Sequence, residues 1–352
     1  MARIALDAMG GDHAPHAPIA GALLALPALA AEHRLQLVGR TAVITETLNA
    51  LLAGEFSSVA AHRDRLDLVE APDVIEMTDK PSVALRGKPQ SSMVVGIRLQ
   101  AEGQSDAFVS AGNTGAQMAA SAFLLKLHAG LKRPAISTLF PTATQPVVVL
   151  DSGANMDCGP EELVQFARLG AVYAEDILGR TNPAVGLLSV GEEEEKGNAA
   201  VKEAHQLLKA SGLHFVGNVE GRDIPKGRSQ HGPLDVVVCD GFTGNVVLKF
   251  YEAVAPFIAG LVVKAGVPRE TVGQALAVLD PNAYGGAPLL GVKGVSIIAH
   301  GSSSPVALKN AIGVAVRAVE SRMDEHIGRR LAAAVSSPAA ADASAGASSS
   351  AH

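Results

Sequence analysis

Short apolar runs alternate with longer segments of helical periodicity along almost the whole chain. The short runs predict strands buried on both faces, and apolar positions recurring every three or four residues after them predict amphipathic helices. This alternation favours an α/β protein with a mostly parallel, doubly wound sheet, because each helix returns the chain to begin a parallel strand. Strands are expected at 4–7, 35–39, 66–70, 107–110, 136–139, 147–151, 185–190, 214–219, 236–240 and 295–299. Helices are expected at about 18–31, 41–52, 91–102, 115–127, 160–178 and 199–210 and after the last two strands, with 71–89 irregular.

The stretch VGLLSVGEEEEKGN at 185–198 combines a buried strand, a loop and the start of a helix. Gly191 ends the strand, four glutamates follow, and Lys196 lies just before a helix that begins near Ala199. A helix N-terminus presents free N–H groups, so a cation beside it is well placed to hold an anionic oxygen. The alternative is that the glutamates stabilise the helix start and Lys196 is only their surface partner.

Most of the other predicted strands also end in loops rich in glycine and small polar residues. Because the carboxyl ends of parallel strands meet at one edge of a sheet, these loops predict a shared anion-binding cleft. The alternative is that each residue is an ordinary turn or N-cap residue. The candidate substrate- and phosphate-binding residues are Asp7, Gly10, Gly11, Asp12, His13, Ser110, Asn113, Thr114, Asn155, Asn198, Asp240, Thr243, Gly244 and His300.

Composition and charge exclude several classes of protein. The chain has 352 residues and a formal charge of −6, and it contains no Lys/Arg run that could grip a nucleic acid. Cys158 and Cys239 do not form a disulfide framework, and the first residues contain no apolar signal segment, which points to the cytoplasm. The apolar stretch 246–266 is interrupted by Lys249, Glu252 and Pro256, so we expect no membrane span there.

The organisation follows from the same reading. Residues 1–334 are expected to form the α/β body, either as one body or as two subdomains, with a helical segment at about 246–283. Residues 335–352 are nearly all alanine and serine and are expected to be disordered.

Several common active-site types are missing. The chain has neither a Walker-type phosphate loop nor a dinucleotide fingerprint, and it lacks a G-x-S-x-G nucleophile elbow. His13 and His16 have no acidic partner of the kind a zinc site needs, and Cys239 fits a buried core position better than a nucleophile. We therefore expect neither metal nor cofactor, and a site that binds anions and positions reactants.

Several long motifs resemble the bacterial acyl-ACP:phosphate acyltransferase (PlsX) family of phospholipid synthesis, and the resemblance covers residues 1 to about 325. It implies a fold similar to those of phosphotransacetylases and isopropylmalate-type dehydrogenases, an α/β/α body that forms homodimers. The motifs are ALDAMGGDHAP, SAGNTGA, LDSGANMDC, VGLLSVGEEEEKGN, FVGNVEGRDI, VVVCDGFTGNVVLK, YGGAPLLGVKG and IIAHGSSS.

The resemblance implies that inorganic phosphate attacks the thioester of a fatty acyl chain carried by acyl carrier protein (ACP). Lys196 matches the lysine that the family places at the site, and Asn245 matches a second catalytic residue whose amide would donate to the thioester oxygen. The implied partners are acyl-ACP, phosphate, a second copy of the chain, a weak peripheral contact at the inner face of the membrane, and a downstream glycerol-3-phosphate acyltransferase. Two alternatives stay open: a CoA-dependent phosphotransacetylase and a non-catalytic lipid-metabolism scaffold on the same fold.

One segment departs from the family pattern. Members often carry a long helical hairpin with an apolar tip between the DGFTGN and YGGAPLLG motifs, whereas 246–283 is shorter and its tip near Gly266–Arg269 is polar. Phe257, Ile258, Leu261 and Val262 still form an apolar face, which suits a membrane, a dimer contact or a core equally well.

Overall fold

A computed structural model describes residues 1–142, 144–276 and 285–335. The chain divides into two compact units, and each combines two stretches of sequence. Unit 1 consists of residues 1–126 and 246–321, and unit 2 consists of residues 127–245 and the chain from Arg322 onward. The predicted Ala/Ser tail lies outside the described residues apart from Val335.

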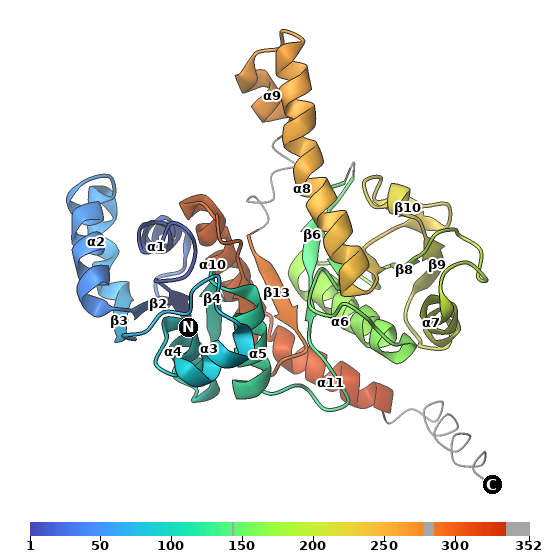
Figure 1. Cartoon of the computed structure of the whole chain (residues 1–352), viewed down its shortest axis with the longest axis horizontal. Coiled ribbons are helices and arrows are strands. Elements are labelled where there is room, and N and C mark those ends of the chain that lie inside the picture. Colours follow the sequence, from blue (N-terminus) through green and yellow to red (C-terminus); the bar gives the residue numbers. More distant parts are fainter. Residues whose placement is uncertain (143, 277–284, 336–352) are drawn as a thin grey trace. The chain divides into compact units, whose positions relative to one another are not determined.

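The sheet of unit 1 has the strand order β3-β2-β1-β4-β14-β13 (Figure 1). Neighbouring strands from β3 to β14 are parallel, and β13 pairs with β14 antiparallel. β4 and β14 are buried along their whole length, so this part of the sheet is covered on both faces. The strands are β1 (Arg3–Asp7), β2 (Arg34–Gly39), β3 (Leu66–Glu70), β4 (Ala107–Ser110), β13 (Ala287–Leu290) and β14 (Val295–Ile298).

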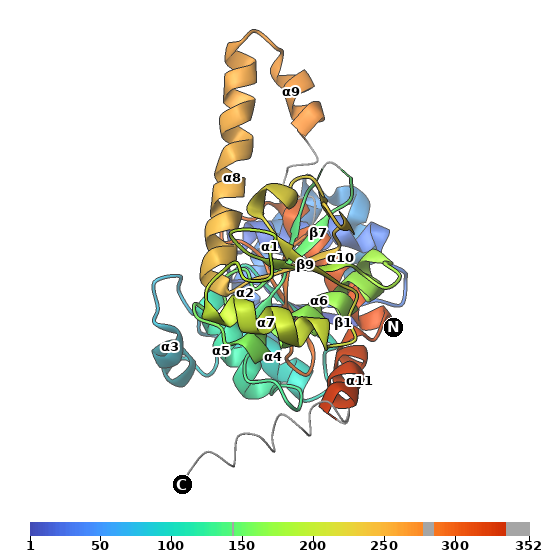
Figure 2. The same cartoon turned by 90° about the vertical axis from the view of Figure 1, so that its right-hand side faces the viewer.

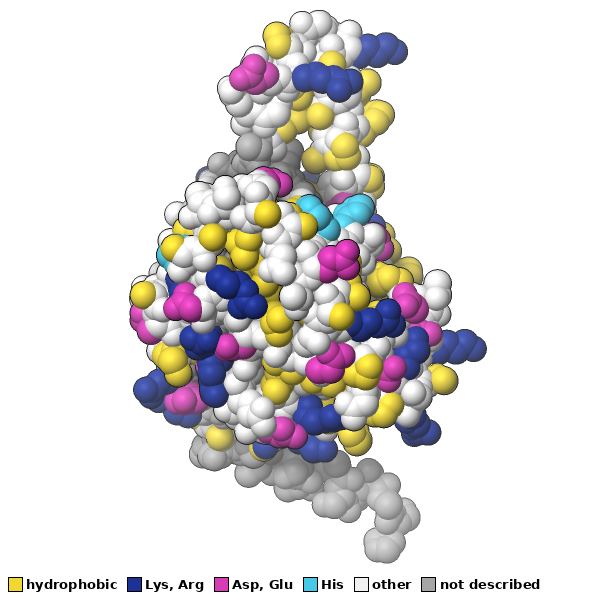
Figure 3. All heavy atoms as spheres, turned by 90° about the vertical axis from the view of Figure 1, so that its left-hand side faces the viewer, with side chains coloured by type: hydrophobic (Ala, Val, Ile, Leu, Met, Phe, Trp, Pro, Cys, Tyr) yellow, Lys and Arg dark blue, Asp and Glu magenta, His cyan; other side chains and the backbone are white. Residues whose placement is uncertain are grey.

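Two groups of helices cover the sheet of unit 1. Helices α1 and α10 pack together and lie with α2 on one face, while α4 and α5 lie on the other (Figure 1). The helical elements on the two faces of this sheet and in its loops are α1 (His16–Ala25), η1 (Leu26–Ala28), α2 (Thr41–Ala53), η2 (Ser57–Arg65), α3 (Pro81–Gly87), α4 (Ser92–Ala101), α5 (Thr114–Leu124) and α10 (Pro305–Glu320). On the side that carries α1 and α2, basic side chains are scattered among acidic and apolar ones (Figure 3).

The sheet of unit 2 has the order β6-β7-β12-β8-β9. β7, β12, β8 and β9 are parallel neighbours, and β6 pairs antiparallel with β7. α6 packs on β7 and β12 and also contacts α7 and α11. The strands of this sheet are β6 (Thr138–Phe140), β7 (Val147–Leu150), β8 (Val185–Leu188), β9 (Phe215–Val219) and β12 (Val236–Val238). Unit 2 also contains the short strand β5 (Ala135–Ile136) and the separate antiparallel pair β10 (Arg228–Ser229) and β11 (Gly232–Pro233). The helical elements are α6 (Pro160–Leu178), α7 (Ala199–Lys209), η3 (Gly221–Asp223) and α11 (Met323–Val335).

Helix α8 (Gly241–Lys264) begins in unit 2 and continues into unit 1, where α9 (Arg269–Leu276) lies beside it (Figures 1 and 2). Its apolar side chains are exposed, including Phe250 (70%), Phe257 (65%) and Leu261 (51%). By length and composition, α8 is the one helix in the described part of the chain that could cross a bilayer. The charges that argued against a span are therefore not decisive, and its exposure is the more informative observation.

The α/β fold class is confirmed, but the expectation of a single sheet is wrong. The parallel strands fall into two separate sheets. In unit 2, the described strands β7, β12, β8 and β9 pair with one another and with β6, and with no strand of the unit 1 sheet. Residues 71–89 are not wholly irregular, since Pro81 occupies the first turn of α3, a position where its missing N–H costs no hydrogen bond.

Candidate active site

At the carboxyl edge of the unit 1 sheet, the ends of β1, β4 and β14 lie side by side. Asp7 ends β1, is buried, and accepts a hydrogen bond from the Ser110 hydroxyl at 2.7 Å. Burial raises the pKa of the Asp7 carboxyl, while hydrogen bonds from neighbouring residues oppose the rise. A Cβ at Gly10 would lie 2.6 Å from Asp7 Oδ2, so this loop must approach the carboxylate closely. Asp7, Gly10 and Ser110 are thus brought together: Ser110 donates to the Asp7 carboxylate, and the Gly10 backbone packs closely against both side chains.

The other predicted residues of this edge divide into engaged and exposed groups. Asn113 caps α5 by accepting from Ala116 N–H at 3.0 Å, and its amide donates to the carbonyls of Glu76, Met77 and Asp79. Gly11 has a φ of +101°, a left-handed conformation that favours glycine. Asp12, His13, Thr114 and His300 have exposed side chains.

At the carboxyl edge of the unit 2 sheet, Asp151 organises the loop that follows β7. Its buried carboxylate accepts from the backbone N–H groups of Ile136, Gly153, Ala154 and Asn155, and from the Asn155 amide at 2.8 Å. Burial raises the pKa of Asp151, and the donors around it oppose that rise. Asn155 also donates to the Pro134 carbonyl at 2.8 Å, so its side chain supports the loop.

The start of α8 is fitted tightly against this loop. Asp240 accepts from both the N–H and the hydroxyl of Thr243 at 2.8 Å, which caps the helix. A Cβ at Gly244 would lie 1.9 Å from the Asp151 carbonyl oxygen, so only glycine allows this approach.

Asn245 follows on the same turn of α8 and is half-buried. Its carboxamide lies beside Gly153, where an added Cβ would be 3.5 Å from Asn245 Oδ1. Within the described part of the chain, this carboxamide makes no hydrogen bond, so it is available to a ligand.

Lys196 lies in the exposed loop between β8 and α7. Its aliphatic stem passes over Gly191, where an added Cβ would be 2.8 Å from Lys196 Cγ. The ammonium group has no ion-pair or hydrogen-bond partner among the residues that the structure describes, although four glutamates precede it. Asn198 ends the loop and caps α7 by accepting from Val201 N–H at 2.9 Å. The interpretation of Lys196 as the surface partner of these glutamates therefore gains no support from the contacts.

The two cysteines are unsuited to nucleophilic attack. Cys239 is buried, as expected, and its thiol pKa is raised by desolvation. Desolvation likewise raises the pKa of Cys158 to about 12. Neither thiol is therefore ionised near neutral pH.

Sequence reasoning did not single out Ser189, which directly follows β8. Its hydroxyl oxygen is buried and has no hydrogen-bond partner among the described residues. A Cβ at Gly197 would lie 3.0 Å from this oxygen, so Ser189 lies beneath the loop that carries Lys196. Ser189 belongs to the motif at 185–198, but nothing in that motif indicates that its hydroxyl lacks a partner.

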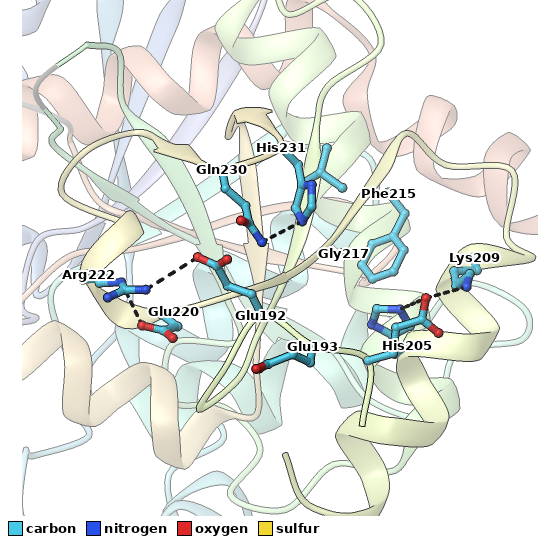
Figure 4. Close-up of a pocket in the computed structure, with 12 residues that line it drawn as sticks. Glu192, Glu193, His205, Lys209, Phe215, Gly217, Glu220, Arg222, Gln230 and His231 are labelled. Atoms are coloured by element: carbon cyan, nitrogen blue, oxygen red, sulfur yellow. Dashed lines mark hydrogen bonds and ion pairs between the residues drawn. The ribbon is translucent and has the colours of Figure 1, made fainter. Parts of the chain in front are cut away.

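The predicted loops thus belong to two sheet edges and not to one. The loops after β1, β4 and β14 meet in unit 1, and those after β7, β8 and β12 meet in unit 2. The cause is the pairing of β7, β8 and β12 in a sheet of their own. Within unit 2, an open pocket of about 680 Å³ lies on the side of the Lys196 loop that faces β9 (Figure 4). Glu192, Glu193 and His205 are among its lining residues, and Lys196 is not.

Comparison of the sequence with known proteins identifies the family of this chain. The family model "Fatty acid synthesis protein" matches residues 2–326. The phosphate acyltransferase of Heliobacterium modesticaldum is 47% identical over 341 residues, covering 92% of this chain and 97% of the relative. That of Desulforamulus reducens is 47% identical over 330 residues, covering 91% of this chain and 94% of the relative.

Solved structures show the same fold at low sequence identity. A phosphotransacetylase from Streptococcus pyogenes has a TM-score of 0.61 at 17% identity, with 91% of this chain and 94% of that chain covered. The EutD phosphotransacetylase from Staphylococcus aureus has a TM-score of 0.60 at 15% identity, with 90% and 94% covered. The fold expectation is confirmed, and so is the resemblance carried by the motifs: the chain belongs to the fatty acid synthesis protein family, together with the phosphate acyltransferases that match it over more than nine-tenths of its length.

Proposed function

We propose that this acyltransferase takes a fatty acyl group from acyl carrier protein and transfers it to inorganic phosphate, giving an acyl phosphate for phospholipid synthesis. Transfer of an acyl group to phosphate rests on the phosphate acyltransferases that match the chain. The names of these relatives do not state the acyl donor, so the assignment of acyl carrier protein as the donor is our proposal. One observation carries the assignment of the site: Lys196 and Asn245 have unpartnered polar groups within the described residues. The other polar candidates of unit 2, among them Asp151, Asn155 and Asp240, are engaged in holding loops.

The reaction needs no covalent enzyme intermediate. A phosphate oxygen forms a bond to the thioester carbonyl carbon, the carbonyl becomes a tetrahedral oxyanion, and the C–S bond then breaks. The sulfur leaves as a thiolate of the carrier's prosthetic group and takes up a proton. Phosphate is already an adequate nucleophile, so the protein has to hold a dianion, orient it and stabilise the oxyanion. The step requires neither a metal nor a redox cofactor.

Lys196 and Asn245 divide this work. The Lys196 ammonium neutralises phosphate beside the N-terminus of α7, whose first N–H groups add a favourable dipole. The Asn245 carboxamide donates to the thioester oxygen as negative charge develops there. In unit 1, the exposed side chains of Asp12, His13, Thr114 and His300 are proposed to face substrate, while Asp7, Gly10, Gly11, Ser110 and Asn113 shape their loops.

A direct assay tests the function. Purified protein is incubated with acyl-ACP and phosphate, and free carrier and acyl phosphate are measured. Acyl phosphate that forms only with acyl-ACP supports the proposal. Turnover with acyl-CoA instead would identify a CoA-dependent phosphotransacetylase, and no turnover with either donor would favour a non-catalytic scaffold.

We predict that Arg228 docks the carrier protein. The carrier protein is strongly acidic and this protein has a net charge of −6, so their attraction must come from basic side chains at the docking surface. Of the basic trio after β9, Arg222 pairs with Glu220 at 2.8 Å and Lys226 with Asp223 at 3.1 Å. Arg228 is exposed and has no such partner in the described residues. Arg228→Glu should raise KM for acyl-ACP severalfold, leave the phosphate KM unchanged and flatten the salt dependence of KM.

The exposed Lys293→Glu is the control for charge alone and should leave both KM values near wild type. Equal effects of the two reversals would mean that net charge, and not Arg228, governs association. No effect of either would move the docking surface elsewhere.

The exposed apolar face of α8 supports two further partners. We propose that it serves as a dimer contact or as a weak peripheral contact with the inner face of the membrane, where a downstream glycerol-3-phosphate acyltransferase would receive the acyl phosphate. Phe257→Gln combined with Leu261→Gln removes the apolar side chains and keeps helix propensity. The double variant should abolish sedimentation with anionic vesicles if the membrane is the partner, or convert dimer to monomer in light scattering if a second copy is. A double variant that matches wild type in both measurements would exclude both roles.

A further inference from the structure

We propose that His205 and Asn218 are positioning residues that fix the backbone of the Lys196 loop through a chain of hydrogen bonds. The inference rests on the proposed role of Lys196 and adds the groups that hold it in place. His205 lines the pocket beside the Lys196 loop (Figure 4). Asn218 lies on the neighbouring strand β9.

The chain of hydrogen bonds begins at one carbonyl. The Glu193 carbonyl oxygen accepts from the backbone N–H of Lys196 at 3.0 Å and from Asn218 Nδ2 at 2.8 Å. Asn218 is fully buried on β9, the edge strand of the unit 2 sheet. A rigid strand is thus joined to the carbonyl that closes the turn carrying Lys196.

The next link fixes the histidine. Because Asn218 Nδ2 faces a carbonyl, its Oδ1 must be an acceptor, and it receives Nδ1–H of His205 at 2.9 Å. His205 is 3% exposed, and its ring meets the Phe215 ring edge-on at 5.0 Å between centroids. The tautomer and the ring orientation are both determined by this packing.

A separate contact holds the neighbouring loop residue. Glu194 Oε1 accepts from Lys209 Nζ at 2.7 Å, and His205 Nε2 lies 3.7 Å from the same oxygen, beyond hydrogen-bond distance. The hydrogen bond from Lys209 is the main cause that lowers the pKa of Glu194 and keeps it ionised. The loop is therefore anchored at Glu193 by its backbone and at Glu194 by its side chain.

These anchors matter because the loop has little else to fix it. Glu193, Glu194, Glu195 and Lys196 are all exposed, so core packing contributes little to their position. A displacement of about 1 Å at a reacting group can lower the rate about 100-fold while the fold hardly changes. Loss of the chain should consequently lower kcat more than it lowers stability.

Two substitutions at His205 distinguish positioning from a general structural role. Asparagine places an N–H donor where Nδ1 was and can still reach Asn218, whereas glutamine places its donor near the position of Nε2, toward Glu194. His205→Gln should lower kcat roughly 10- to 100-fold, with KM for acyl-ACP near wild type and faster hydrogen exchange in the peptide 190–198. His205→Asn should restore most of kcat and of the exchange protection.

The exposed His231 lines the same pocket without joining the chain, so His231→Phe is the matched control and should behave as wild type. Glu194→Ala, at an exposed position, provides a variant whose folding is not in question, and it should show a smaller loss in the same direction. Equal kcat for His205→Asn and His205→Gln, or unchanged exchange in His205→Gln and Glu194→Ala, would overturn the positioning role. Absence of acyl transfer in the wild-type protein would instead overturn the proposed function, and the exchange measurement would still report whether the hydrogen-bond chain holds the loop.

Discussion

Replacement of Lys196 by alanine is expected to reduce kcat by roughly 10²–10³-fold, the usual loss when one charge-stabilising group leaves an active site. The ammonium is exposed and unpaired within the described residues, so its removal breaks no ion pair or hydrogen bond of the side chain. The unfolding midpoint should therefore stay within a few degrees of wild type. Steady-state kinetics with acyl-ACP and phosphate, together with thermal unfolding, measure both effects.

Two companion variants make this prediction specific. Lys196→Arg keeps the charge but replaces a compact ammonium by a larger planar fork with a different donor geometry, so it should also be poor. Lys202→Ala removes an exposed lysine from the next helix and should retain full activity. Near-wild-type kcat in Lys196→Ala would remove Lys196 from the mechanism.

Asn245→Asp should be at least as damaging as Asn245→Ala, with kcat reduced roughly 10²–10³-fold. The aspartate places an acceptor and a negative charge where the proposed step needs a donor for a developing oxyanion. The loss of kcat should not be accompanied by loss of stability, because a negative charge near a helix N-terminus is favourable or neutral for the helix. Comparison of kcat with the unfolding midpoint in both variants is the measurement.

The order of the two Asn245 variants decides the role. If aspartate restores activity relative to alanine, the residue acts as a base or a helix cap and the oxyanion role is wrong. Asn155→Ala is an informative contrast, since that amide supports the Asp151 loop and its loss should lower stability together with activity.

Local elements were predictable wherever a single pattern determined them. The helix at 160–178 has the predicted bounds, and the helix at 199–210 differs from α7 by one residue. The assignment of strands to sheets was not predictable, because parallel strands far apart in sequence carry the same apolar pattern whichever sheet they join. β13 was missed for a similar reason, since its pairing with β14 is antiparallel and its short sequence APLL has no alternation.

The candidate site stays a prediction, and the strand-end pattern by itself does not separate ligand-binding residues from structural ones. Strand ends followed by Gly, Asn and Asp mark both ligand loops and capped helices, so Asn113 and Asn198 looked the same as Asn245 in the sequence. The structure distinguishes them by contacts, because the first two are engaged in caps and Asn245 is not. Asn218 lies in the motif FVGNVEGRDI, but neither Asn218 nor His205 could be given a role from the sequence, since their partners are a backbone carbonyl and each other.

Helix α8 joins the carboxamide of Asn245 and the exposed apolar side chains on a single helix, with Pro256 between the first turns and Leu261. A helix transmits bending and twisting along its backbone hydrogen bonds, and proline removes one of them. Variants of the apolar face that introduce glycine or a second proline would therefore displace Asn245, the proposed oxyanion donor, several turns away from the change. Only substitutions that preserve helix propensity can report on what this face touches, and a loss of turnover after any other change cannot be assigned to a lost partner.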